Sequence, residues 1–377
     1  MKILFTRFPL ESAWGGAEVQ TMSLMRGLLA KSHAVAFLGS CPVLLGKCRE
    51  ENIPCVEFDI GPPPVTKWNA LSFSWRARGM RQRLLGAIGS FRDLGAVVML
   101  SLSEKILATE PLAKEGKRVL WIEHDRVGRW LTANPWLSNL RGAARHATTV
   151  CVSELSKQMY LDLGWPEERT VVIPNGIDLE KFQPPPPSPL PRRGRGDRGW
   201  GLGGEKGDGT LRLGCLARMT HDKGIDILIE AMKDLPNTSL TIVGTGREES
   251  ALKRRAAGIP CITFVEQIDD LADFYRSVDV LVLPSREHDP FGLVAAEAMA
   301  CGTAVIVTDA CGIAGYLTDG VDAVIVKAGS AEELRQAIER MKNEEVRERI
   351  AAEGLRTAQR LFEAGAMVDR YERLLMS

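Results

Sequence analysis

The chain has 377 residues, of which 45% are hydrophobic and 25% are charged, so it is long enough for two globular domains with a full core each. Lysine and arginine together number 48, as do aspartate and glutamate, and a net charge of zero gives no argument for a polyanionic partner. There is no run of eighteen apolar residues and no C-x-x-C pair among the eight cysteines, so the sequence predicts neither a membrane-spanning helix nor a zinc site, and we expect free thiols in a reducing cytosol.

The chain begins with a predicted strand at residues 2–7, because its apolar run is too short for a signal peptide. A loop containing Gly15 and Gly16 follows, and then an amphipathic helix. The order strand, glycine loop, helix lets backbone amides approach a phosphate. Two glycines alone are weak evidence, since any tight turn between a strand and a helix can require them.

Alternating strands and helices are predicted through the rest of the first half. This alternation indicates a parallel sheet with helices on both faces, where ligands bind beyond the carboxyl ends of the strands. His124 follows one such strand directly, although a lone histidine at a strand end is more often structural than functional. The predicted strands are 34–38, 56–60, 96–100, 118–122 and 148–152.

The segment 65–92 is basic and contains no acidic residue; its lysine and arginines alternate with aromatic and aliphatic residues. Such a segment can lie on an anionic membrane surface. The alternative is an ordinary basic surface helix whose apolar side packs on the core. Nothing else in the sequence supports nucleic-acid binding. We therefore expect a cytoplasmic protein, attached peripherally to the inner face of the membrane through 65–92, with no nucleic-acid partner.

Residues 175–210 are predicted to link two domains. Pro174 ends a strand, and Asn175-Gly176 favours a turn. From residue 183 onward a run of four prolines and many glycines cannot bury enough apolar surface to become ordered, so we expect a mobile segment. The stretch 199–206 superficially suggests a P-loop, but Glu205 stands where lysine is required.

The second half begins with a predicted strand at 211–216, followed by a loop with Arg218 and Lys223 before a helix. Two cations at a helix start are unfavourable for the helix dipole, and a bound dianion would offset that cost. Two solvated charges are the alternative. The strand at 241–243 leads into a glycine turn at Gly244, which fails as a dinucleotide fingerprint because Glu249 occupies the third glycine position.

The strongest signal is the stretch 285–302, which follows an apolar strand at 278–284. Asp289 is predicted as the N-cap of a helix and Pro290 as its first residue. The free amides at the start of that helix can hold an anion; they belong to Phe291, Gly292 and Leu293.

Glu297 lies eight residues after Asp289, which is about 12 Å along a helix. That separation is about the reach needed to touch a sugar at one end of a nucleotide diphosphate and a ribose at the other. In the alternative interpretation, Asp289 is only a cap and Glu297 is only a solvated helix residue.

Together these motifs resemble those of the family 4 retaining glycosyltransferases with the GT-B fold, also described as glycosyl transferases group 1. The resemblance rests on the Gly-Gly loop, His124, the Pro-Asn-Gly segment, Arg218 with Lys223, and the acidic pair. It implies an α/β protein with two Rossmann-like, doubly wound parallel-sheet domains facing a cleft. The implied divisions are an acceptor-side domain 1–174, the linker 175–210, a nucleotide-sugar-binding domain 211–361, and a closing helix 362–377 that crosses back to the first domain.

The resemblance implies retaining transfer of a hexose-type sugar from a nucleotide-diphosphate sugar to a lipid-linked or glycan acceptor, with no cofactor. No Asp-x-Asp is present to hold a metal ion. His124 and Asp289 are the implied catalytic residues. A sugar-nucleotide epimerase of similar fold remains an alternative. Since the family usually has Glu where Asp289 stands, a catalytically weakened nucleotide-sugar-binding subunit is another. The implied donor-binding residues are Gly15, Gly16, Arg218, Lys223, Gly244, Phe291, Gly292, Leu293 and Glu297.

Overall fold

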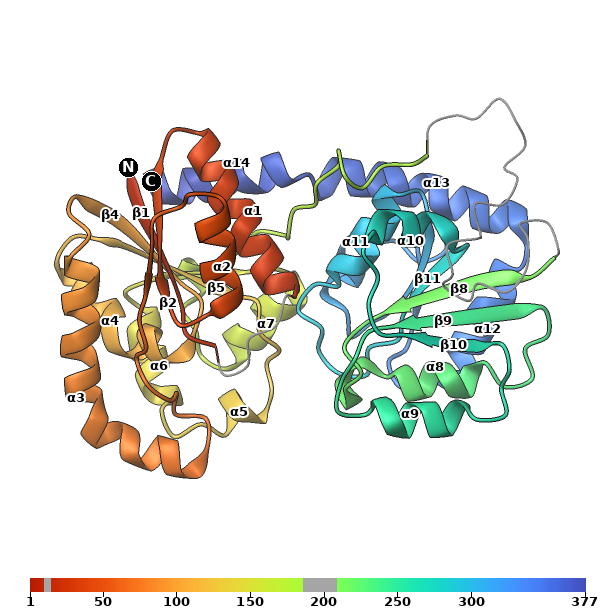
Figure 1. Cartoon of the computed structure of the whole chain (residues 1–377), viewed down its shortest axis with the longest axis horizontal. Coiled ribbons are helices and arrows are strands. Elements are labelled where there is room, and N and C mark those ends of the chain that lie inside the picture. The colour runs from red at the N-terminus through yellow and green to blue at the C-terminus, as the bar shows by residue number, and fades with distance from the viewer. Residues whose placement is uncertain (10–14, 186–208) are drawn as a thin grey trace. The chain divides into compact units, whose positions relative to one another are not determined.

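The computed structural model describes residues 1–9, 15–185 and 209–377 (Figure 1). The chain divides into two compact units. Unit 1 comprises Met1–Gly176 and Ala364–Ser377, and unit 2 comprises Ile177–Glu363. Most of the segment expected to be mobile lies outside the described residues, and so does the P-loop-like stretch 199–206.

Unit 1 contains a seven-stranded sheet, parallel throughout, in the order β3-β2-β1-β4-β5-β6-β7. The order reverses between β1 and β4, so the loops after these strands flank a topological switch point. The strands are β1 Lys2–Arg7, β2 Ala34–Gly39, β3 Cys55–Glu57, β4 Leu94–Met99, β5 Arg118–Glu123, β6 Thr148–Cys151 and β7 Thr170–Val172.

The strand expected at 56–60 is wrong in extent, because β3 ends at Glu57. Asp59 accepts the amide of Gly61 at 2.7 Å and turns the chain, so Ile60 is buried without joining the sheet. An apolar residue here marks the core and not the strand.

Each face of the sheet in unit 1 has its own core, because side chains alternate along a strand. Leu4 and Trp121 contribute to the core beneath α3, α4, α6 and α7, whereas Ile3 and Ile122 contribute to the core beneath α1, α2 and α14. The helices are α1 Gly16–Ala30, α2 Pro42–Glu50, α3 Lys67–Gly89, α4 Leu102–Lys114, α5 Arg129–Thr132, α6 Leu137–Ala144, α7 Glu154–Asp162 and α14 Ala364–Met376, with a 3₁₀ turn η1 at Glu167–Arg169.

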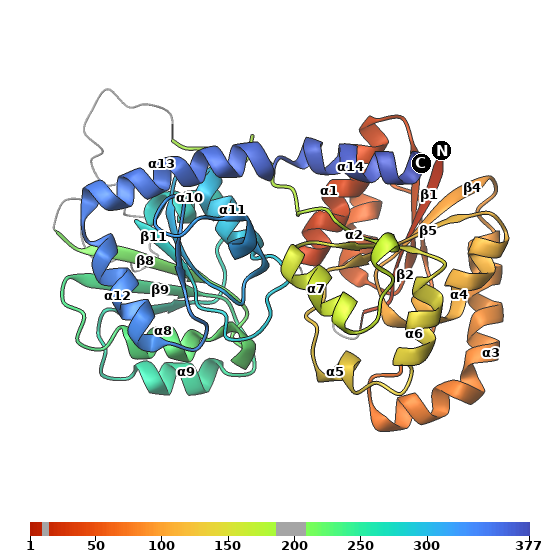
Figure 2. The same ribbon diagram turned by 180° about the vertical axis from the view of Figure 1, so that it is seen from behind.

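The last helix, α14, packs on α1 although the whole of unit 2 separates them in sequence (Figure 2). Gly27 of α1 leaves room for Val368, and a Cβ at Gly27 would overlap its methyl groups. Lys31 forms ion pairs of 2.8 Å with both Asp369 and Glu372. Unit 1 is therefore built from both ends of the chain.

Unit 2 contains a six-stranded parallel sheet in the order β10-β9-β8-β11-β12-β13, with its switch point between β8 and β11. The strands are β8 Leu211–Leu216, β9 Thr238–Val243, β10 Ile262–Val265, β11 Val280–Leu283, β12 Ala304–Thr308 and β13 Val324–Val326. The helices are α8 Ile225–Ala231, α9 Glu249–Ala256, α10 Leu271–Ser277, α11 Leu293–Ala300, α12 Ala331–Met341 and α13 Glu344–Leu361, with 3₁₀ turns η2 His221–Lys223 and η3 Gly312–Tyr316.

All eight cysteines are free thiols. No helix among the described residues is long and apolar enough to cross a membrane.

Candidate functional site

The loops at the carboxyl end of the unit 2 sheet are packed backbone to backbone. Gly224 adopts φ 62°, and a Cβ there would overlap the carbonyl oxygen of Pro284, in the loop after β11. Gly244 adopts φ 133°, and a Cβ there would overlap the carbonyl oxygen of Ala217 in the loop after β8. Only glycine combines these dihedrals with so close an approach. Gly244, predicted to contact the donor, thus has a packing requirement of its own.

Lys223 and Asp289 meet at the switch point of this sheet. The Lys223 ammonium lies 2.7 Å from an Asp289 carboxylate oxygen, and Ser285 Oγ donates to the same oxygen at 3.2 Å. Burial acts to raise the pKa of Asp289, but the Lys223 charge and the hydrogen bonds from Lys223 and Ser285 outweigh it, so the pKa lies below its ordinary value. Burial acts to lower the pKa of Lys223, but Asp289 raises it overall. Both groups are therefore charged at neutral pH.

The backbone around Asp289 is extended, contrary to the predicted helix start. The Asp289 amide donates to the Ala310 carbonyl at 2.9 Å, and the Gly312 amide donates to the Asp289 carbonyl at 2.8 Å. The Ile313 amide donates in turn to the Phe291 carbonyl at 2.6 Å. This pairing with the loop after β12 competes with helix formation. The helix α11 therefore starts at Leu293, and the predictions of Asp289 as N-cap and Pro290 as first helical residue are wrong.

The start of α11 presents free backbone donors. Gly292 is the N-cap, with φ 93°, and a glycine has no side chain with which to cap the helix. The amides of Phe291, Gly292 and Leu293 have no hydrogen-bond partner in the part of the chain that the structure describes. Because the peptide dipoles of a helix add up to a partial positive charge at its N-terminus, these amides are suited to an anion.

Arg218 is exposed in the loop after β8, and its guanidinium makes no ion pair with any described residue. Lys223 is the last residue of the 3₁₀ turn η2, two residues before α8 begins at Ile225. The loop that carries both residues is tied to the loop after β11, because the Arg286 amide donates to the Asp222 carbonyl at 2.8 Å. Arg218 and Lys223 therefore lie in one loop, which a backbone hydrogen bond holds to the loop after β11.

Glu297 is buried, with 5% of its surface exposed, so the alternative of a solvated helix residue is wrong. Its carboxylate accepts a hydrogen bond of 2.7 Å from the Tyr275 hydroxyl of α10. Burial raises the pKa of Glu297 to about 7, and the bond from Tyr275 offsets only part of that effect.

In unit 1, Gly15 is the N-cap of α1 and Gly16 is its first residue. Glu18, in the first turn of α1, forms a buried ion pair of 2.6 Å with Arg7 at the end of β1. His124 follows β5 and is half-buried. Burial, with smaller contributions from the charges of Arg7 and Lys105, lowers the pKa of His124 to about 3. Its imidazole is therefore neutral at physiological pH.

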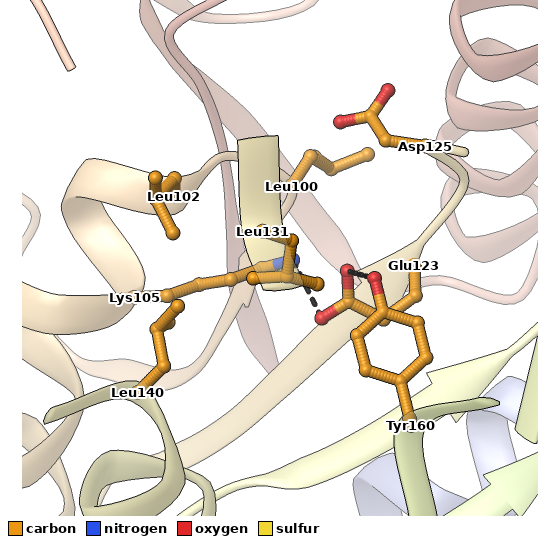
Figure 3. Close-up of a pocket in the computed structure, with 8 residues that line it drawn as sticks. All are labelled: Leu100, Leu102, Lys105, Glu123, Asp125, Leu131, Leu140 and Tyr160. Carbon is orange, nitrogen blue, oxygen red and sulfur yellow. Dashed lines mark hydrogen bonds and ion pairs between the residues drawn. The ribbon is translucent and has the colours of Figure 1, made fainter. Parts of the chain in front are cut away.

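A buried polar network adjoins His124 in sequence and was not predicted (Figure 3). The Lys105 ammonium lies 2.9 Å from Glu123, and the Tyr160 hydroxyl donates to the other carboxylate oxygen of Glu123 at 2.9 Å. The three side chains line a small cavity of about 20 Å³, with room for one water molecule. Asp125 also lines it, but its carboxylate points away from this network in Figure 3. The other lining residues are Leu100, Leu102, Leu131 and Leu140.

A signal for part of this network does exist in the sequence. Lys105 lies three and seven residues before Ala108 and Leu112, which places its side chain on the apolar face of α4. A lysine on such a face needs a buried carboxylate, and Glu123 at a strand end could supply one. Tyr160 carried no comparable signal.

This chain is similar in sequence and in fold to known proteins. The model of Glycosyltransferase Family 4 matches residues 14–181, and that of Glycosyl transferases group 1 matches residues 210–344. D-inositol 3-phosphate glycosyltransferase of Xylanimonas cellulosilytica is 31% identical over 243 residues, which are 61% of this chain and 57% of that protein. The lipopolysaccharide core biosynthesis mannosyltransferase LpcC of Rhizobium leguminosarum bv. viciae is 27% identical over 333 residues, 85% of each chain.

Among solved structures, HepE of Anabaena in complex with UDP and glucose superimposes with a TM-score of 0.79 at 19% identity, covering 100% of this chain and 99% of that one. The parallel sheets described above are those of the GT-B architecture. This chain belongs to the group 1, family 4-like glycosyltransferases.

Proposed function

We propose that the protein is a retaining glycosyltransferase that moves a hexose-type sugar from a nucleotide-diphosphate sugar to a lipid-linked or glycan acceptor. The observation that carries the proposal is the ion pair of Lys223 with Asp289 at the switch point of the unit 2 sheet, with the free amides that open α11 beginning two residues after Asp289. A half-buried cation together with unpaired helix amides is suited to a diphosphate.

The relatives support the substrate classes. One is named for transfer to an inositol phosphate and another for mannosyl transfer in lipopolysaccharide core biosynthesis, and HepE was solved with UDP and glucose. We extend these classes to this chain as a nucleotide-sugar donor and a glycan or lipid-linked acceptor. Peripheral attachment to the inner face of a membrane is part of the same proposal.

Chemically, the reaction requires that a departing diphosphate be stabilised. Lys223 and Arg218 supply fixed positive charge, and the amides of Phe291, Gly292 and Leu293 supply dipoles that need not reorganise as charge develops. Since the sequence has no Asp-x-Asp, we assign this stabilisation to these groups without a metal ion.

The remaining roles are those that the family resemblance implies. Asp289 is assigned to the hydroxyls of the transferred sugar and Glu297 to the ribose. His124, neutral at physiological pH, can donate a hydrogen bond to the sugar or its phosphate without adding a charge. The leaving phosphate is the assigned acceptor of the proton from the attacking hydroxyl.

Arg218→Met tests the proposal most directly, because the Arg218 guanidinium makes no ion pair with any described residue and its loss breaks none. Donor binding should weaken at least tenfold by calorimetry with UDP- and GDP-sugars, with thermal unfolding unchanged. Arg349→Met, an exposed arginine of the same unit, is the matched control. Wild-type donor affinity and turnover in Arg218→Met would refute the assignment. Conversion of the donor to another sugar nucleotide without any acceptor would favour the epimerase instead.

A further inference from the structure

Helix α3 has two opposite apolar sides, of which only one is buried. Ala70, Phe73, Met80, Leu84 and Ile88 face the core of unit 1 at helical spacing. Figures 1 and 2 both show α3 at the rim of unit 1, outside α4. The buried side accounts for why the helix folds onto the unit, and the other side needs a separate explanation.

The outer side carries the three most exposed large hydrophobic residues in the described part of the chain. Trp68 is 81% exposed, Trp75 is 85% exposed and Leu71 is 66% exposed. Their spacing of three and four residues places them in one row along the helix. Single exposed apolar residues are normal, but a row of two tryptophans and a leucine indicates a binding surface.

Two basic residues flank this row. Lys67 and Arg78 are exposed, and neither forms an ion pair with any residue in the described ranges. We call Lys67, Trp68, Leu71, Trp75 and Arg78 the docking face. No acidic residue occurs between Asp59 and Asp93, so α3 itself offers no neutralising partner.

Not every cation of α3 is available. Arg76 donates to the Pro62 carbonyl, and Arg83 donates to the Asp59 carbonyl at 2.9 Å, so both fasten the helix to the preceding loop. The acid that faces this region from the neighbouring α4 is Glu110, which pairs with Lys114 and lies within electrostatic range of Arg81. The docking face therefore keeps an uncompensated positive charge.

We propose that the docking face binds the surface of an anionic lipid bilayer, with the tryptophans and Leu71 in the interfacial region and Lys67 and Arg78 against the lipid phosphates. Tryptophan suits this region because its ring is apolar while its N–H keeps a polar partner. Stable protein–protein interfaces use roughly 20–30 residues on each side. The docking face is too small for such an interface, which favours a lipid surface over a protein partner. The inference rests on the membrane attachment included in the proposed function and names the residues that carry it; it does not depend on the sugar chemistry.

Vesicle sedimentation tests it with the full chain and no sugar nucleotide. The protein should sediment with vesicles of equal parts phosphatidylcholine and phosphatidylglycerol, and much less with phosphatidylcholine alone. Each basic residue near an anionic surface is worth about fivefold in partitioning, so Lys67→Ser/Arg78→Ser should weaken binding about 25-fold. Trp68→Ser/Trp75→Ser should weaken it at least tenfold. Because these side chains are exposed, thermal unfolding should not change.

Val321→Ser, an exposed apolar residue of unit 2, and Arg349→Ser are matched controls and should bind like the wild type. Equal sedimentation with both vesicle types, sedimentation with neither, or wild-type binding by both double variants would overturn the inference. So would a dimer in sedimentation velocity that Trp68→Ser/Trp75→Ser dissociates, since the occupant would then be a second copy of the chain. Transfer to a water-soluble acceptor should be normal in all these variants, which separates this result from the proposed function.

Discussion

The Lys223 ammonium and the Asp289 carboxylate, 2.7 Å apart, join the loop after β8 to the loop after β11. The sequence predicted that both side chains contact the substrate. The structure shows that they form an ion pair with each other. Each charge fixes the position of the other, so the donor site proposed above would be preformed. We therefore expect the pair to make a structural and a functional contribution, which can be measured separately.

Lys223→Met should destabilise the protein by about 3 kcal/mol, because it leaves the largely enclosed Asp289 carboxylate without its cation. The double variant Lys223→Met/Asp289→Asn should recover most of that stability without recovering donor binding. Urea unfolding and calorimetric titration with donor measure the two effects. Lys233→Met, which breaks only an exposed pair with Glu230, should be neutral in both. A double variant that binds donor normally would show that Lys223 contributes structure alone.

Asp289→Glu tests whether the aspartate at position 289, where the family usually has glutamate, limits the rate of transfer. The backbone of Asp289 is fixed on both sides by Ala310 and Gly312, so the added methylene must extend the carboxylate further from β11. We expect transfer at least as fast as in the wild type, and a loss of about a hundredfold in Asp289→Asn. Steady-state transfer assays measure both. A wild type that binds donor without turnover, with activity appearing only in Asp289→Glu, would identify a weakened binding subunit.

Stability should depend on pH through Glu297. Its pKa is raised from 4.5 to about 7 in the folded state, so the folded protein holds this proton in a range where the unfolded chain has lost it. The contribution to stability is fully present below about pH 4.5 and is lost as pH rises to 7; it amounts to on the order of 3 kcal/mol. Glu297→Gln keeps an acceptor for Tyr275 and should flatten this dependence in melts from pH 4.5 to 8. An unchanged profile would place the titration elsewhere.

The imidazole of His124 should remain neutral across the working range. Its pKa of about 3 reflects burial first and then the charges of Arg7 and Lys105. NMR titration of the ring should show no midpoint between pH 5 and 8, and the transfer rate should show no inflection that His124→Gln removes. A midpoint near 6.5 would indicate a solvated ring.

The buried network around Glu123 should be costly to break in part. Lys105→Met leaves the Glu123 carboxylate without its cation, and we expect a loss of about 3–5 kcal/mol. Tyr160→Phe removes one hydrogen bond to the same carboxylate and should cost about 1–3 kcal/mol. Chemical unfolding checks both. Lys114→Met, whose partner Glu110 is exposed, is the control and should change stability by less than about 1 kcal/mol.

Much of the fold was predictable because parallel strands buried on both faces appear as short apolar runs. The strands at 34–38, 118–122 and 211–216 correspond to β2, β5 and β8 within one residue at each end. Local chemistry explains the exceptions. Residues 331–361 form two helices, α12 and α13, and not one continuous helix, because Asn343 caps a new helix by accepting the Val346 amide.

The site was predictable in part only. Spacing placed Lys223 and Asp289 in the loops that follow two neighbouring strands, but their ion pair depends on how those loops pack. The start of α11 was misplaced because hydrogen bonds from Gly312 and Ile313, more than twenty residues later, hold the preceding segment extended. Long-range backbone pairing of this kind leaves no local trace in the sequence.

The position of α14 has a consequence for biosynthesis. Val368, Tyr371 and Leu375 of this helix complete a core whose buried members outside the helix lie between residues 3 and 173. Residues such as Met25 and Leu28 can therefore reach their full burial only after unit 2 and α14 have been translated. Nascent chains arrested at Glu363 should accordingly be cut within 1–176 by protease, whereas chains that include α14 should be resistant there.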